Sequence, residues 1–333
     1  MIEHVYSAAE TRYECGMQYR RAGRSGVMLP AISLGLWHNF GDVDTLSLSR
    51  KKLHYAFDHG ITHFDLANNY GPSYGSAEET FGQIMKSSFA PYRDELFIST
   101  KAGHDMWPGP YGNWGSRKHL MASLDQSLKR MNLDYVDVFY SHRYDPETPL
   151  EETLQALVDI VRKGKALYVG LSKYPLDAYL FASRYLKERD VPCLLYQGRY
   201  SMLVREPESQ GILNAVKENG SGFVAFSPLA QGLLTNRYLN GIPDNSRIAR
   251  GGFLKKEALT PEVLSKIQAL NERAAMRGQS LAEMALAWLL KNETVTSVIV
   301  GASSVEQLGD SLKTLNHLSF EEEELHAIEK ILM

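Results

Sequence analysis

The sequence predicts a (β/α)8 barrel, and two patterns indicate it. Short apolar runs of β-forming residues alternate along the chain with longer amphipathic stretches, which favours a parallel sheet covered by helices. Eight such runs occur, seven of them separated by helical segments and the last followed by one, which favours a barrel over an open sheet. Runs that are apolar on both faces, such as 136–140, are typical of strands buried beneath helices.

The strands are expected, in chain order, at 31–36, 61–65, 96–99, 136–141, 166–171, 193–197, 222–226 and 297–301. The amphipathic stretches between the earlier strands include 46–59, 117–131, 150–163 and 176–189. Helices are also expected on either side of the last strand, at 281–291 and 305–315.

Three segments lie outside the eightfold repeat. Residues 17–28 are expected to form a hairpin that turns at 23–26 and plugs the bottom of the barrel. An extra helix is predicted at 260–277, because Thr260 is a capping residue and Pro261 suits the first helical position. A terminal helix is expected at 320–332. One domain over 1–333, with the barrel proper at about 30–316, is the simplest organisation.

Composition excludes several classes of function. The 333 residues are 44% hydrophobic and carry a net charge of -3, so neither a nucleic acid nor a membrane surface is an expected partner. Cys15 and Cys193 are the only cysteines, which does not suit a disulfide framework. The first residues lack the pattern of a signal peptide, and no apolar run approaches the ~20 residues of a membrane span. We therefore expect a cytoplasmic protein.

Four polar residues follow the ends of three successive strands. Asp65 ends the second expected strand, Tyr70 lies in the loop after it, Lys101 follows the third strand and His142 follows the fourth. Taken singly, Asp65 suits a helix cap, Tyr70 suits surface packing and His142 suits a structural role. The ends of parallel barrel strands meet on one face, however, so the four are expected to surround one ligand.

Together these residues suit proton donation to a carbonyl oxygen. We expect Lys101 to lower the pKa of Tyr70, and Asp65 to pair with Lys101 and offset its burial. His142 would orient the carbonyl while Tyr70 supplies the proton. The hydride must come from a cofactor, because no side chain donates one.

The cofactor site is not a Rossmann module, because no GxGxxG lies between a strand and a helix. The last strand instead runs through Gly301 and Ser303 into a helix, whose first N–H groups suit a phosphate; ordinary capping is the alternative. Phe226, after the seventh strand, suits stacking on a flat heterocycle; barrel core is the alternative.

At these residues the chain resembles the aldo-keto reductases, in the branch of the bacterial L-glyceraldehyde-3-phosphate reductases and the potassium-channel β subunits. The resemblance extends from about residue 17 to about residue 315. Asp65, Tyr70, Lys101 and His142 match the catalytic tetrad of that family. The segments that narrow the resemblance to the reductase-like group are 34–41, 101–103, 107–112 and 140–143.

The resemblance implies NADPH extended across the barrel mouth. The residues that match cofactor contacts are Trp37, Ser172, Gln197 and Phe226 around the nicotinamide, Ser227, Leu229, Gln231 and Gly232 over the pyrophosphate, and Ser303, Gln307 and Arg247 at the adenosine end. Arg247 would contact the 2′-phosphate, which favours NADPH over NADH. Asp310 and Ser311 stand where the channel subunits have Glu and Asn on the adenine, and Arg237 stands where they have Lys.

The implied activity is reduction of small aldehydes, with L-glyceraldehyde 3-phosphate as the leading substrate and methylglyoxal as another. Trp37 and Trp107 would form walls of the substrate pocket, and core packing is the alternative. Arg143, Lys173 and Arg117 are the candidate cations for a substrate phosphate, and solvated surface charge is the alternative.

Two other functions are considered. A regulatory subunit that binds NADP(H) with little turnover would keep the fold and the tetrad. A metal-dependent barrel hydrolase is not favoured, because no HxH ends a strand and no second acid lies near Asp65, so no metal site is expected. The resemblance also implies a homo-oligomer of four or more subunits.

Overall fold

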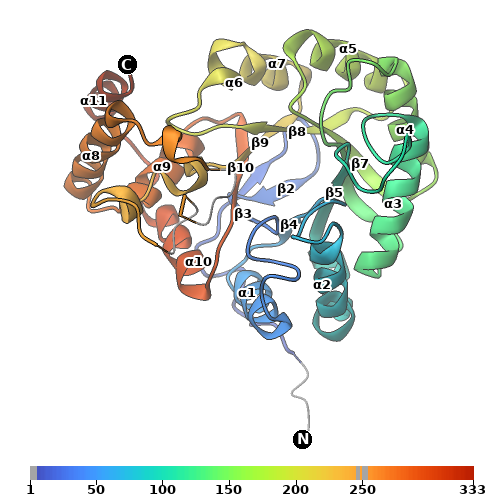
Figure 1. The fold of residues 1–333 in the computed structure, drawn as a ribbon, viewed down its shortest axis with the longest axis horizontal. Helices are drawn as coiled ribbons and strands as arrows, with labels where there is room; N and C mark the ends of the chain where they lie inside the picture. Colours follow the sequence, from blue (N-terminus) through green and yellow to red (C-terminus); the bar gives the residue numbers. More distant parts are fainter. Residues whose placement is uncertain (1–5, 245–247, 250–253) are drawn as a thin grey trace, which may run out of the picture.

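Eight parallel strands close into a barrel that is ringed by helices (Figure 1). The computed structural model describes residues 6–244, 248–249 and 254–333. The strands follow one another around the barrel in the order β10-β3-β4-β5-β6-β7-β8-β9. The predicted (β/α)8 barrel is therefore confirmed. None of the described helices combines the length and the apolar character that crossing a membrane requires.

Each predicted strand overlaps an observed one. The barrel strands are β3 (Ile32–Gly35), β4 (His63–Asp65), β5 (Phe97–Ala102), β6 (Val136–Ser141), β7 (Ala166–Ser172), β8 (Cys193–Arg199), β9 (Gly222–Phe226) and β10 (Val295–Val300). The main difference is at β5, which runs past its predicted end because Lys101 pairs with Tyr140 of β6. Lys101 is therefore part of the sheet and not of the loop that follows it.

The helices also follow the predicted alternation. They are α1 (Leu46–Asp58), α2 (Ser76–Ile84), α3 (Arg117–Met131), α4 (Leu150–Arg162), α5 (Leu176–Lys187), α6 (Glu206–Ser209), α7 (Ile212–Asn219), α8 (Pro261–Met276), α9 (Leu281–Leu290), α10 (Val305–Leu312) and α11 (Glu322–Leu332). Short helical turns are η1 (Met85–Phe89), η2 (Ala90–Glu95), η3 (Ala230–Gly232), η4 (Asn236–Tyr238), η5 (Lys256–Ala258) and η6 (Lys313–Asn316). No bounds were predicted for α2 and α7, which fill two places in the repeat.

The extra helix α8 begins as its sequence predicts. The Thr260 side chain accepts a hydrogen bond from the N–H of Val263, and Pro261 occupies the first turn. Helix α8 and the terminal helix α11 pack together outside the barrel ring, on the side of α9 (Figure 1).

The N-terminal hairpin closes one end of the barrel. Strands β1 (Tyr19–Arg21) and β2 (Met28–Pro30) pair antiparallel, so the second strand extends beyond the predicted residue 28. Ala22 and Leu29 are fully buried in one cluster with residues of β6, β8, β9 and β10. The N–H of Arg24 also donates to the carbonyl of Gly220, next to the start of β9. The hairpin therefore covers the end opposite the strand ends that carry the polar residues.

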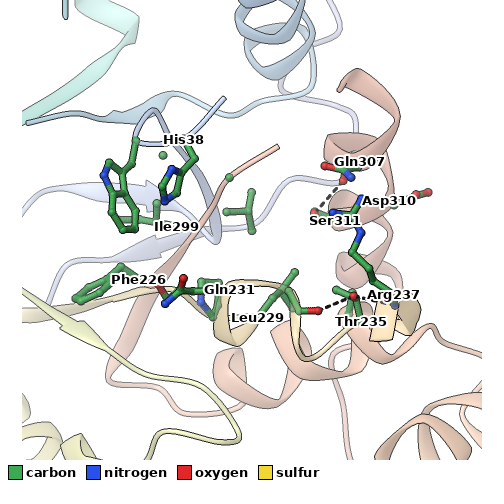
Figure 2. Close-up of a pocket in the computed structure, with 18 of the residues that line it drawn as sticks. His38, Phe226, Leu229, Gln231, Thr235, Arg237, Ile299, Gln307, Asp310 and Ser311 are labelled. Carbon is green, nitrogen blue, oxygen red and sulfur yellow. Dashed lines mark hydrogen bonds between the residues drawn. The ribbon is translucent and has the colours of Figure 1, made fainter. Parts of the chain in front are cut away.

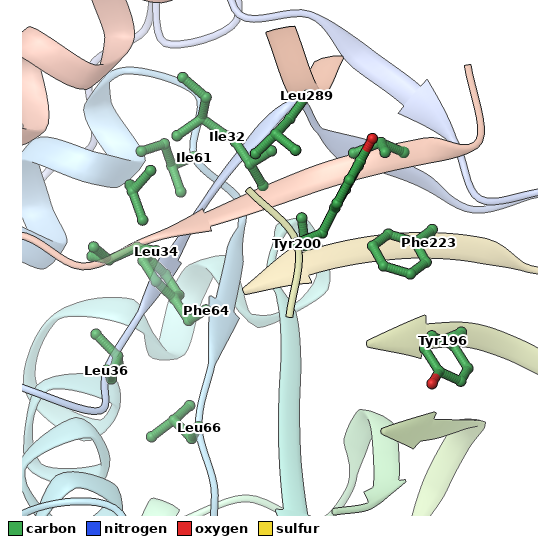
Figure 3. Packing of buried hydrophobic residues seen from close by; sticks show 14 of the residues in the cluster. Ile32, Leu34, Leu36, Ile61, Phe64, Leu66, Tyr196, Tyr200, Phe223 and Leu289 are labelled. Atoms are coloured by element: carbon green, nitrogen blue, oxygen red, sulfur yellow. The ribbon is translucent and has the colours of Figure 1, made fainter. Parts of the chain in front are cut away.

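Apolar side chains fill the space between the barrel and its helices. Figure 3 shows Leu34 and Phe64 of neighbouring strands packed close together, with Leu36 and Leu66 nearby. These residues are fully buried or nearly so. Because this layer takes one face of each strand, the other face is left for the barrel interior, where the polar residues lie.

Gly82 allows α2 and α3 to approach closely. A Cβ at this position would lie 2.0 Å from the carbonyl oxygen of Arg130, and no side-chain rotation relieves a clash with backbone. The contact also brings Glu78 within 2.8 Å of the Arg130 guanidinium in a buried ion pair.

We predict that Gly82→Ala lowers the free energy of unfolding by about 2 kcal/mol or more, because one helix must move away from the other. The midpoint of urea unfolding measures this effect. Gly26→Ala is the matched control, since its Cβ would meet nothing within 4 Å, and we expect a change within about 1 kcal/mol. Equal midpoints for the two variants would contradict the prediction.

Candidate active site

A buried ion pair lies at the centre of the site. Lys101 of β5 is fully buried, and its Nζ donates to Asp65 Oδ2 of β4 at 2.7 Å and to the carbonyl of Leu66 at 2.5 Å. An ammonium without a partner is rarely found in such an interior. The two neighbouring strands therefore provide the opposite charges together, and the pair predicted from the sequence is formed.

The second oxygen of Asp65 is held by two further donors. Ser99 Oγ donates to Asp65 Oδ1 at 2.8 Å, and Gln197 Nε2 donates to the same oxygen at 3.0 Å. Gln197 belongs to β8, on the far side of the barrel from β4, so its bond to Asp65 crosses the barrel interior. The carboxylate is thus fixed from three directions.

Tyr70 lies against the lysine, but its pKa shifts in the direction opposite to the prediction. Lys101 Nζ lies 3.3 Å from the Tyr70 hydroxyl and 4.8 Å from the centre of its ring. Burial, with a smaller contribution from Asp65, raises the pKa of Tyr70 well above its usual value. The expected lowering does not occur because burial disfavours the tyrosinate and the Asp65 carboxylate adds to the rise. Tyr70 is therefore protonated at neutral pH, which is the state of a proton donor.

His142 faces Tyr70 from the end of β6. The two rings are nearly perpendicular, with centres 5.9 Å apart. Burial, together with the charges of Lys101 and Lys173, lowers the pKa of His142 well below its usual value. The imidazole is therefore neutral at neutral pH. Its Nδ1 is buried and has no hydrogen-bond partner among the described residues.

A hydrogen-bonded chain supports the carboxylate from the barrel interior. Ser297 Oγ lies 2.6 Å from Ser33 Oγ, which lies 2.8 Å from His63 Nδ1. His63 Nε2 lies 3.1 Å from Ser99 Oγ, the donor to Asp65. Burial lowers the pKa of His63 to about 4, so this ring is neutral too. The sequence analysis did not identify this chain, although His63 and Ser99 each lie two residues before a tetrad residue on the same strand.

A first cavity of about 510 Å³ opens beside Tyr70 and runs along the barrel mouth. Figure 2 shows His38 and Phe226 at one end of it, and Arg237 with Gln307 of α10 at the other. The predicted cofactor residues that line it are Trp37, Phe226, Ser227, Leu229, Gln231, Gly232, Gly301, Gln307, Asp310 and Ser311. The cavity is thus elongated and joins the aromatic end to the start of α10.

A second cavity of about 860 Å³ adjoins the first, and Trp37, Tyr70 and Phe226 line both. Ser172 and Gln197 line this second cavity, together with His142. Of the tetrad, Asp65 lines the first cavity, His142 lines the second and Tyr70 lines both, while the buried Lys101 contacts Tyr70 and lines neither.

Besides Lys101, three predicted site residues among those described line neither cavity, and these are Ser303, Trp107 and Arg143. The N–H and Oγ of Ser303 both donate to Gln307 Oε1, and Ser303 lines neither cavity. Arg247 lies outside the described residues. The Trp107 ring packs on His119, and the Arg143 guanidinium donates a hydrogen bond to the carbonyl of Gly103. Neither side chain lines a cavity.

The sequence analysis predicted cofactor residues in the loop after β9, but it did not predict the backbone conformation of that loop. Ser227, Ala230 and Gln231 have φ values of 52°, 47° and 60°, in the left-handed region that these residue types seldom adopt. This backbone brings Arg237 to the cavity wall, a residue that the sequence analysis noted but did not place in the site. Strain of this kind leaves no pattern in composition or periodicity.

The first cavity, together with the adjoining part of the second, fits a dinucleotide with phosphates. Ser172 Oγ, which lines the second cavity, is buried and has no hydrogen-bond partner in the described part of the chain, which suits an amide ligand. Gly301 leaves open space before α10, whose N-terminus suits an anion, and Arg237 adds a cation nearby. Within the same described residues, no group of His, Cys, Asp and Glu is suited to a metal ion.

We predict that Lys101→Met lowers the free energy of unfolding by about 3–5 kcal/mol, because it leaves the Asp65 carboxylate buried without its counter-ion. Asp65→Asn added to Lys101→Met removes that charge and should restore part of the loss. Urea unfolding of the two single variants and the double variant forms the cycle. Strictly additive losses would contradict the coupling of the pair.

Comparison with known proteins agrees with this geometry. The chain is 57% identical to the L-glyceraldehyde 3-phosphate reductase of Escherichia coli O157:H7 over 331 residues. These aligned residues make up 98% of this chain and 95% of that protein. The L-glyceraldehyde 3-phosphate reductase of Escherichia coli (strain K12) is 56% identical with the same coverage. A probable voltage-gated potassium channel subunit beta of Arabidopsis thaliana is 36% identical over 306 residues, or 90% of this chain and 92% of that protein.

Residues 31–333 match the Aldo/keto reductase family. The match covers the whole barrel and every tetrad residue, and it agrees with the resemblance found in the sequence. The chain therefore belongs to the aldo/keto reductase family and is an oxidoreductase.

Proposed function

We propose that the protein reduces small aldehydes to alcohols with NADPH, and that Tyr70 is the proton donor. The observation that carries this proposal is the position of the protonated Tyr70 hydroxyl. It lies 3.3 Å from Lys101 Nζ, in a residue that lines both cavities. An aldehyde in the second cavity would thus meet the proton donor Tyr70 beside a hydride donor placed where the two cavities join.

Each side chain of the tetrad has its own role in polarising and protonating the carbonyl. Tyr70 and the neutral His142 hydrogen-bond the carbonyl oxygen and polarise it. Tyr70 then gives its proton to that oxygen, and Lys101 stabilises the tyrosinate that remains. Asp65 holds Lys101 charged and in place. When bound, the cofactor supplies the hydride.

The adenosine end of the first cavity supports NADPH over NADH. Arg237 lines this end with Gln307, Asp310 and Ser311, and Arg247 is proposed to join it. A guanidinium fork suits the 2′-phosphate dianion, which NADH lacks. Ser172, Gln197 and Phe226 are proposed to hold the nicotinamide.

L-Glyceraldehyde 3-phosphate is the leading substrate. Two relatives that are 56% and 57% identical over almost the whole chain are named for its reduction. Methylglyoxal is proposed as a second substrate, because it offers the same aldehyde group without a phosphate. Assembly into four or more subunits stays a prediction of the resemblance.

A regulatory subunit that binds NADP(H) is the second candidate function. The 36% identity to a probable potassium channel subunit beta favours it. Tight NADPH binding without turnover of either aldehyde would support this candidate over the reductase.

We predict that Tyr70→Phe lowers kcat for L-glyceraldehyde 3-phosphate by about 10²- to 10⁴-fold, because the proton donor is lost. NADPH oxidation measures the rate, and quenching of protein fluorescence by NADPH tests that binding persists. Tyr168→Phe, at the exposed start of β7, is the control and should keep the parent rate. A Tyr70→Phe rate within tenfold of the parent would contradict the assigned role.

We also predict that Arg237→Ala raises KM for NADPH by about tenfold and leaves KM for NADH nearly unchanged, because only NADPH carries the 2′-phosphate. Steady-state kinetics with each cofactor measure the difference. Arg184→Ala, at an exposed position of α5, is the control. An equal change for both cofactors would remove Arg237 from phosphate recognition.

A further inference from the structure

We propose that Lys173 and His104 form a subsite of the second cavity that binds the phosphate group of a phosphorylated aldehyde. This inference rests on the proposed function and extends it, because it names the residues that separate a phosphorylated substrate from an uncharged one. Both residues line the second cavity together with Tyr70 and His142.

The backbone holds Lys173 at the cavity mouth. Lys173 directly follows β7, and its N–H donates to the carbonyl of Gln197 at 3.1 Å. Its φ is 57°, in the left-handed region that is uncommon for a residue with a long side chain. Such strain persists where the surrounding structure imposes it, and it often marks a functional position.

The charge of Lys173 lacks an anionic partner. Its Nζ donates to His104 Nε2 at 3.1 Å, and in the described part of the chain it forms no ion pair with a carboxylate. The charged groups that act on it are Arg143 and Lys101, which are both cations. An ammonium in this position suits an anionic ligand.

The other candidate cations have partners elsewhere. Arg143 donates to the carbonyl of Gly103 at 2.8 Å and to Asn113 Oδ1 at 2.7 Å, and it stacks on the Trp114 ring. Arg117 forms an ion pair with Asp159. Neither arginine lines the cavity, so of the three cations considered from the sequence only Lys173 faces the substrate space.

The spacing suits a three-carbon substrate. The ring centres of His142 and His104 are 4.5 Å apart, and Lys173 Nζ lies 3.1 Å from His104 Nε2. In L-glyceraldehyde 3-phosphate four bonds separate the carbonyl carbon from phosphorus, or about 5 Å. A carbonyl held by Tyr70 and His142 therefore leaves the phosphate within reach of His104 and Lys173.

The subsite also predicts a dependence on pH. Partial loss of solvation at the cavity wall, with the charges of Arg143 and Lys101, lowers the pKa of Lys173 to about 8, and His104, with a pKa of about 4, is neutral. The second phosphate pKa is about 6, so a dianion meets a charged lysine between about pH 6 and pH 8. Above that range Lys173 loses its proton, and KM for the phosphorylated aldehyde should rise.

The test compares two aldehydes in the holoenzyme. We expect Lys173→Met to lower the ratio of kcat/KM for L-glyceraldehyde 3-phosphate to kcat/KM for methylglyoxal by about 10- to 100-fold. His104→Asn should lower it in the same direction. Arg117→Ala is the matched control, because that cation pairs with Asp159 and does not line the second cavity, and the ratio should not change.

A second measurement needs no turnover. Inorganic phosphate should raise the Tm of the NADPH-bound parent, and this rise should be much smaller in Lys173→Met. Equal losses for both aldehydes, or an equal Tm rise in parent and variant, would overturn the subsite. A parent that reduces methylglyoxal but not the phosphorylated aldehyde, with no effect of phosphate, would overturn the subsite and leave the reductase standing. A parent that is silent with both aldehydes but shows the Lys173-dependent Tm rise would instead refute the proposed function alone.

Discussion

The ion pair of Asp65 and Lys101 is the constraint on which the site depends. Both groups are buried inside the barrel, and neither charge would be stable there alone. The surrounding polar side chains are placed to satisfy this pair, with Ser99 and Gln197 donating to the carboxylate. In turn the pair positions the ammonium next to Tyr70. The pair as a whole carries no net charge, and its ammonium remains a strong hydrogen-bond donor beside the Tyr70 hydroxyl.

The barrel interior has an apolar part and a polar part, and the polar part surrounds the ion pair. One part is apolar, with Val138, Leu195 and Val224 packed on the hairpin that closes the end away from the site. The other part holds the hydrogen-bonded chain that includes His63 and ends at the carboxylate. The ion pair is therefore buried on this side, and Tyr70 and His142 line the cavities. Burial then keeps both Tyr70 and His142 in their uncharged forms.

Positive charge increases toward the outer end of the second cavity. Lys101 is neutralised by its partner, whereas the Lys173 ammonium bonds His104 and forms no ion pair with a carboxylate in the described part of the chain; its charged neighbours are cations. The same cavity thus combines a neutral reaction centre with a charged rim. An aldehyde group suits the centre and a phosphate suits the rim, which is the physical basis of the proposed substrate preference.

The sequence alone determined the barrel, the hairpin and the capped helix α8, and it predicted the four residues of the tetrad. These follow from apolar periodicity, caps and residue types at strand ends, which are local signals. Only the tertiary structure decided that Lys101 lies within β5, that His63 and Ser99 support Asp65, and that the pKa of Tyr70 is raised. The tertiary structure also shows that Lys173 lines the second cavity and that Arg143 does not. These outcomes depend on contacts between distant strands and on how deeply each ionisable group is buried, and the spacing of residues along one segment encodes neither.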